Sequence, residues 1–143
     1  MSISDLDQKW FDFTGQYVDK LNQNNGDWSQ LTKEEQELAA LWRLEMDVHN
    51  GGFLQFFTNW GIDCYEHAIR CLKKIGAKKS LDIIRSSFTV IDKYKEDKRL
   101  KAYFDLYKLI SEDDHTQLDL LDNQYWELPD NIQELTFRVY QVR

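Results

Sequence analysis

The sequence predicts an all-α fold, a single compact bundle of seven to eight helices that spans residues 1–143. The chain contains one proline and six glycines, which is too few for the turns that many short strands would need. Apolar residues recur at spacings of three and four along most of its length, the period of a helix with one buried face. A hydrophobic content of 42% is sufficient for a substantial core.

Two helices are expected in the first third of the chain. Ser4 is placed to cap a helix whose apolar stripe runs from Leu6 to Leu21, and a polar, asparagine-rich loop ends this helix. Thr32 and Glu35 have the spacing of a capping box and predict the start of the second helix. That helix carries a wide apolar arc as far as the double glycine.

The stretch 45–61 is expected to form a helical corner. Asn50, Gly51 and Gly52 should end the second helix, with a positive φ angle at one of the two glycines. Asn59 and Gly61 should end the short helix that follows. The residues expected on the buried face of this short helix are all aromatic: Phe53, Phe56, Phe57 and Trp60.

Apolar periodicity predicts five further helices after this corner. They cover approximately residues 63–75, 81–91, 100–110, 118–128 and 132–139. No repeat, linker or convincing strand is evident, so one all-helical domain is expected.

Glu45 and His49 are candidate functional residues because both fall in the middle of the apolar arc. Buried polar side chains require partners, and we expect Glu45 to accept hydrogen bonds from the free N–H groups of the helix that begins near Gly51. The favoured interpretation is a structural pair that holds the corner. The alternative is a catalytic acid–base pair, although no nucleophile motif or phosphate-binding loop accompanies it.

Cys64, His67 and Cys71 lie on one side of a predicted helix, at spacings of three and four residues. Zinc sites usually place two cysteines closer together at a turn, so we expect neither a metal nor any other cofactor. The two cysteines are two helical turns apart, which makes a disulfide between them sterically unfavourable. We therefore expect two free thiols at the edge of the core.

Charge is distributed unevenly along this acidic chain, whose net charge is −7. Residues 63–110 carry 12 Lys and Arg against 7 Asp and Glu, whereas both flanking segments are acidic. The acidic balance disfavours direct binding of nucleic acid and favours a basic protein partner. No apolar stretch is long enough for a membrane span, and the N-terminus lacks the features of a signal peptide, so a cytoplasmic protein is expected.

The C-terminal segment is the candidate partner-binding surface. It could equally be an ordinary solvated helix surface. The carboxylates that would face Lys and Arg of a partner are Glu112, Asp113, Asp114, Asp119, Asp122, Glu127, Asp130 and Glu134.

The corner motif, Asn-Gly-Gly-Phe-x-Gln-Phe, resembles the bacterial DNA-mimic-protein family. Weaker agreement covers about residues 28–143, after the N-terminal helix. The matching residues of the corner are Glu45, Val48, Asn50, Gly51, Gly52, Phe53, Gln55, Phe56, Asn59 and Gly61. The resemblance implies an all-α and often dimeric protein without a cofactor or catalytic activity. It also implies that an acidic surface occupies the DNA-binding face of a transcription regulator, while the corner motif itself is a feature of the fold.

Three functions therefore follow from the sequence. The first is a non-enzymatic acidic binding protein, of the DNA-mimic type, for a basic and DNA-binding partner. The second is an immunity or antitoxin-type protein that neutralises one cognate enzyme. The third is a small enzyme that uses Glu45 and His49.

Overall fold

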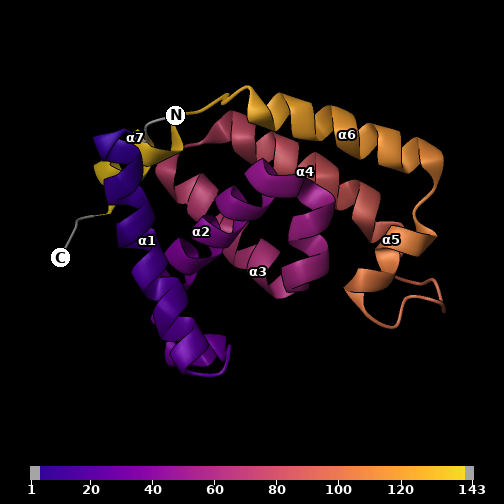
Figure 1. The fold of residues 1–143 in the computed structure, drawn as a ribbon, viewed down its shortest axis with the longest axis horizontal. Coiled ribbons are helices and arrows are strands. Elements are labelled where there is room, and N and C mark those ends of the chain that lie inside the picture. Colours follow the sequence, from indigo (N-terminus) through magenta and orange to yellow (C-terminus); the bar gives the residue numbers. More distant parts are fainter. Residues whose placement is uncertain (1–3, 141–143) are drawn as a thin grey trace.

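The structure is a computed structural model that describes residues 4–140, and these residues form helices and connecting loops without a strand (Figure 1). The predicted all-α fold of seven to eight helices is confirmed. The α-helices are α1 (Asp5–Gln23), α2 (Lys33–Gly51), α3 (Phe53–Ile75), α4 (Lys78–Asp92), α5 (Leu106–Leu109), α6 (Glu112–Trp126) and α7 (Ile132–Val139), with 3-10 helices η1 (Trp28–Gln30) and η2 (Tyr103–Asp105).

Helices α2 and α3 form the centre of the molecule (Figure 1). Helix α1 packs along α2 on one side, and α7 packs against both α1 and α3. Helix α4 packs against α3, and α6 runs alongside α4 (Figure 1). The main core is therefore built from the buried face of α2, both halves of α3, and the inward sides of the helices around them.

The predicted N-terminal caps of α1 and α2 are present. Ser4 Oγ accepts a hydrogen bond from Asp7 N at 3.1 Å. In α2, Thr32 Oγ1 accepts from Glu35 N, and the Glu35 carboxylate accepts from Thr32 N. Each cap satisfies backbone donors that the first turn of a helix cannot pair internally.

The predicted helix over residues 100–110 is wrong for most of its length. Loop 93–102 leads into η2, and α5 contains only four residues. Asp105 Oδ2 accepts hydrogen bonds from the backbone N–H groups of Lys101 and Ala102, which holds the chain in a turn. Phe104, within this predicted helix, is 65% exposed.

Helix α3 is broken at Gly61, as the sequence predicts, because Gly61 has φ +72° and ψ −162°. The prediction that Trp60 is buried is wrong. Phe53, Phe56 and Phe57 are fully buried, but Trp60 lies at the break and is 39% exposed. Its ring packs on the guanidinium of Arg43 from α2.

Candidate functional site

Two glycines allow the chain to turn between α2 and α3. Gly52 has φ +95° and ψ −179°, so the predicted positive φ is confirmed, in a conformation that few residues other than glycine adopt. A Cβ atom on Gly52 would lie 2.2 Å from Asp122 Oδ2. One on Gly51 would lie 2.1 Å from Gln55 Oε1. Side chains at these positions would displace both of these polar groups.

Helix α6 holds this corner from the outside through three successive polar contacts. Asp122 Oδ1 accepts a hydrogen bond from Phe53 N at 2.8 Å and so caps the start of α3. Tyr125 OH donates to Glu45 Oε2 at 2.5 Å. Trp126 Nε1 donates to the carbonyl oxygen of Val48, near the end of α2, at 2.6 Å. The spacing of three and one residues places all three side chains on one face of α6.

The expected partner of Glu45 is therefore wrong. The carboxylate that accepts from the N-terminus of α3 belongs to Asp122, a residue far away in sequence, and Glu45 bonds to a tyrosine instead. The reason is geometric. Glu45 lies almost two turns before the end of α2 and faces α6, whereas α3 begins on the far side of Gly52.

Burial changes the acidity of the groups around this corner. Desolvation raises the pKa of Glu45 to about 7, against a smaller opposing effect of the Tyr125 hydrogen bond. It likewise raises the pKa of Asp122 to about 6. The pKa of His49 is lowered by partial burial. His49 Nε2 lies 3.8 Å from Glu45 Oε2, which is too long for a hydrogen bond.

A chain of amides stabilises the other side of the corner. Asp47 accepts hydrogen bonds from Gln55 Nε2 at 3.0 Å and from Asn59 Nδ2 at 3.2 Å. Asn50 Nδ2 donates to Gln55 Oε1. Asp47 is half-buried because it links the last turns of α2 to the first turns of α3. The polar residues of the motif thus bond to one another across the turn.

The geometry does not place Glu45 and His49 in a common cleft. A cleft of about 370 Å³ between the start of α1 and the α6–α7 loop reaches Glu45, but His49 is not among its lining residues. Glu45 itself is only 3% exposed and directs its Oε2 atom to Tyr125. This arrangement supports a structural role for Glu45 in joining α2 to α6. The expectation that His49 is buried in the apolar arc is wrong, because this side chain lies at the surface, beside Tyr125 and Glu45.

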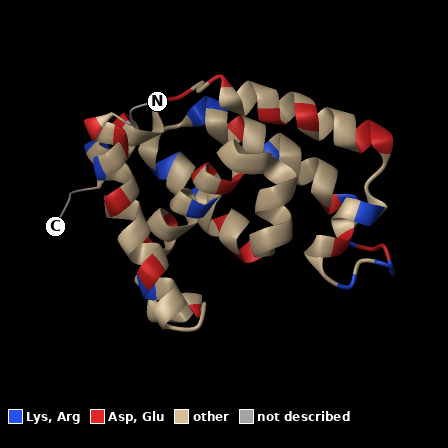
Figure 2. Cartoon of the chain, viewed as in Figure 1, with Lys and Arg blue, Asp and Glu red and all other residues tan. Residues whose placement is uncertain are grey.

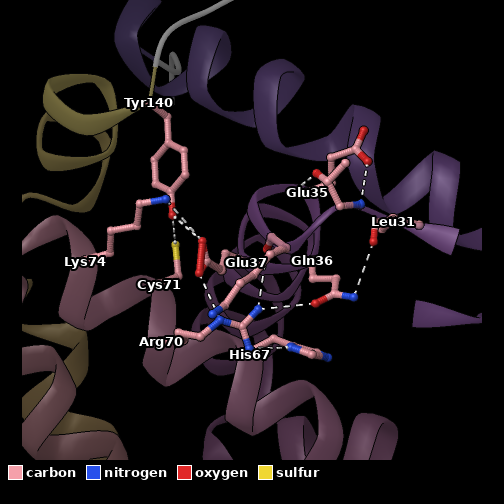
Figure 3. A network of polar contacts seen from close by, with 11 residues as sticks. Leu31, Glu35, Gln36, Glu37, His67, Arg70, Cys71, Lys74 and Tyr140 are labelled. Carbon is pink, nitrogen blue, oxygen red and sulfur yellow. Dashed lines mark hydrogen bonds and ion pairs between the residues drawn. The ribbon is translucent and has the colours of Figure 1, made fainter. Parts of the chain in front are cut away.

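A second buried carboxylate, Glu37, lies at the centre of a polar network between α2, α3 and the end of α7 (Figure 3). It accepts from Arg70 Nε at 2.9 Å, from Tyr140 OH at 3.2 Å and from Lys74 Nζ at 3.4 Å. Arg70 also contacts His67 Nδ1 at 2.9 Å. Sequence analysis missed Glu37, although it shares a helical face with the buried Leu41 and Leu44 of α2.

The three side chains considered as metal ligands each contact a different partner in the protein. The Cys71 thiol contacts Tyr140 OH, the buried Cys64 thiol lies beside Arg43, and His67 packs on Trp28. Burial raises the pKa of both thiols to about 12. Among residues 4–140, no group of three or more His, Cys, Asp or Glu side chains is arranged to hold a metal ion.

Half of the predicted partner-binding carboxylates have partners within the protein. Asp114 accepts from Lys93 and Tyr94, and Asp122 caps α3. Asp130 accepts from Ser80 N at 2.7 Å and so caps α4. Glu134 pairs with Arg138 on α7.

The other four carboxylates lie on the outer surface of α6. Glu112, Asp113, Asp119 and the C-cap residue Glu127 are all exposed. Only Asp119 has a described ionic neighbour, His115 at 3.4 Å. Figure 2 shows acidic residues along the length of this helix. We call these four residues the α6 acidic row.

The fold and site define a helical domain whose central motif is a structural corner and whose exposed α6 surface is acidic. The family model for DMP19-like proteins matches residues 29–142, and the chain belongs to this family of DNA-mimic type. The family resemblance inferred from the sequence is thus confirmed. Comparisons with curated proteins and with solved structures give no match. No helix within residues 4–140 is both long and apolar enough to cross a membrane.

Proposed function

We propose that this protein is a non-enzymatic binding protein whose α6 acidic row occupies the DNA-binding surface of a basic protein. Membership of the DMP19-like family supports a function of the DNA-mimic type. The observation that carries the proposal is the α6 acidic row, because its four carboxylates face away from the core. Lys and Arg side chains that normally contact phosphates would pair with them.

The dimensions of α6 suit this role. With a rise of 1.5 Å per residue, Glu112 and Glu127 are separated by about 22 Å along the helix axis. This length corresponds to about six to seven base-pair steps of duplex DNA. One row carries fewer charges than a duplex of this length, so a homodimer, which the family resemblance implies, would supply a second row.

Residues 63–110 carry a net positive charge, which would repel a basic partner. Ion pairs within the protein reduce this repulsion. Lys93 pairs with Asp114 at 2.5 Å, beneath the start of α6. Arg70 and Lys74 both pair with the buried Glu37. Between α4 and α5 the chain carries three acids among five bases, and Figure 2 shows both signs of charge in this loop. Five of the twelve bases of residues 63–110 therefore have a described ion pair within the protein. Within the α6 acidic row, only Asp119 has such a neighbour.

A DNA-displacement experiment tests this proposal. The purified protein is immobilised, its binding partner is captured and identified, and the partner is then bound to its own DNA in a gel-shift assay. We expect addition of the protein to release the DNA. We also expect the affinity to fall as the salt concentration rises, because the contacts are between exposed charges.

Two matched variants with four neutralised acids each locate the binding surface. The first variant removes the α6 acidic row by E112Q, D113N, D119N and E127Q. We expect it to displace DNA at least tenfold less efficiently. The control variant removes four exposed acids elsewhere, by D63N, E66Q, D82N and E96Q. Equal losses in both variants would contradict the assignment to α6, and a partner that does not bind DNA would contradict mimicry.

A further inference from the structure

A cleft of about 420 Å³ lies between α1 and α2, away from the α6 acidic row. Three aromatic side chains form its walls: Phe11 from α1, Trp42 from α2 and Trp60 from the break in α3. The Phe11 and Trp42 rings are 5.7 Å apart. Phe11 and Trp60 are 41% and 39% exposed, so this cleft leaves a large aromatic area open to a ligand.

The base of this cleft contains a buried cation. Arg43 is only 6% exposed, and its guanidinium lies 3.6 Å from the centre of the Trp60 ring. Its only described hydrogen bond to an oxygen is a long one, 3.3 Å, to the side-chain amide of Asn22. Arg43 Nε and the neighbouring Trp42 Nε1 are buried donors without a hydrogen-bond acceptor among the described residues.

No carboxylate among residues 4–140 forms a described ion pair with Arg43. Asp47 influences Arg43 at longer range, but its two oxygens accept hydrogen bonds from Gln55 and Asn59. The Cys64 thiol beside Arg43 is neutral because burial raises its pKa to about 12. Desolvation lowers the pKa of Arg43, and the Cys64 thiol and Asp47 oppose this shift only in part. A buried cation of this kind gains stability from an added anion.

We propose that this cleft binds a small organic carboxylate whose apolar or aromatic body packs against Phe11, Trp42 and Trp60. The carboxylate oxygens would accept hydrogen bonds from the terminal N–H groups of the Arg43 guanidinium, because Arg43 Nε and Trp42 Nε1 are themselves covered by the protein. The cleft volume is within the range typical of small-ligand sites. An aromatic body would stack on the indole rings, as bases and other planar groups do on exposed tryptophans.

Two acids at the mouth of the cleft restrict the choice of ligand. Asp12 and Asp19 of α1 also line it and are exposed. They would repel polyanions such as nucleic acid, and they favour a ligand with a single negative charge. An ammonium group on the same molecule would be attracted to them, so a zwitterionic aromatic amino acid should bind more tightly than the simple carboxylate.

A titration with defined probes tests this site independently of any protein partner. Indole-3-acetate is added to the ¹⁵N-labelled protein while the indole N–H signals of its five tryptophans are followed by NMR. We expect saturable shifts of the Trp42 and Trp60 signals with a Kd of about 1 mM or below. The neutral analogue indole-3-acetamide should bind at least fivefold more weakly, and free tryptophan more tightly than indole-3-acetate.

Single substitutions confirm where the probe binds. W60A removes an exposed ring and should weaken binding at least fivefold without unfolding the protein. R43Q should abolish the preference for the carboxylate over the amide. F104A removes a ring that is still more exposed than Trp60 and lies outside the cleft, and it should change nothing. Three results would overturn the proposal. The first is the absence of saturable shifts up to about 10 mM probe. The others are equal binding of the amide and the carboxylate to the wild-type protein, and equal losses of binding in W60A and F104A.

Discussion

Replacing Glu45 with glutamine should stabilise the protein at alkaline pH. In the native state the pKa of Glu45 is about 7, against an ordinary value of 4.5, because burial disfavours its charged form. The native state therefore retains a proton that the unfolded chain loses as the pH rises from 4.5 to 7. The free energy of unfolding falls across this window and is constant above it. At 1.36 kcal/mol per pKa unit, the loss is about 3 kcal/mol.

The E45Q variant should not lose stability as the pH rises through this window, and it keeps the hydrogen bond with Tyr125. A glutamine side-chain oxygen can accept the Tyr125 hydroxyl proton, and the amide N–H₂ can point toward the neutral ring of His49. Urea unfolding followed by far-UV circular dichroism at pH 5 and pH 8 measures the effect. We expect the variant to equal the wild type at pH 5 within about 1 kcal/mol and to exceed it by about 2–3 kcal/mol at pH 8.

Two outcomes would refute this reasoning about Glu45. One is a variant that is destabilised equally at both pH values, which would mean that the ionised carboxylate is the stabilising form. The other is an equal gain in E66Q, which neutralises an exposed acid on α3 and serves as the control. Both proteins should retain a smaller loss of stability between about pH 4 and 6, because burial raises the pKa of Asp122 to about 6.

Two further predictions concern the corner and the Glu37 network, and both are measured by urea unfolding at pH 7. G52A should lower the free energy of unfolding by about 2–4 kcal/mol, because φ is +95° and the new Cβ atom would collide with a carboxylate of α6. Gly26 also has a positive φ, but a Cβ atom there would have no neighbour within 4 Å, so G26A should lower the free energy of unfolding by only about 1 kcal/mol. Equal losses in G52A and G26A would contradict the role of the collision. E37A should lower the free energy of unfolding by about 3 kcal/mol, because Arg70 and Lys74 lose a buried partner, and an unchanged midpoint would show that the network contributes little.

Local sequence signals predicted most of the helices because their causes are local. The capping box of α2 involves residues three apart, and the break at Gly61 follows from the backbone freedom of one glycine. Periodicity failed at residues 100–110, where the side chain of Asp105 bonds to two backbone N–H groups and favours a turn. Trp60 has the correct spacing for the core, but the chain changes direction immediately after it.

The sequence by itself determined the helical architecture, the corner motif and its positive-φ glycine, and the burial of Glu45, because helix periodicity and turn chemistry depend on neighbouring residues. Only the tertiary structure decided which carboxylates are structural. Asp122 and Asp130 resemble the other C-terminal acids in sequence, yet both cap distant helices, and Glu112 and Asp119 face solvent. Their roles depend on where α6 and the loop after it lie against α3 and α4, and packing between helices far apart in the chain sets those positions.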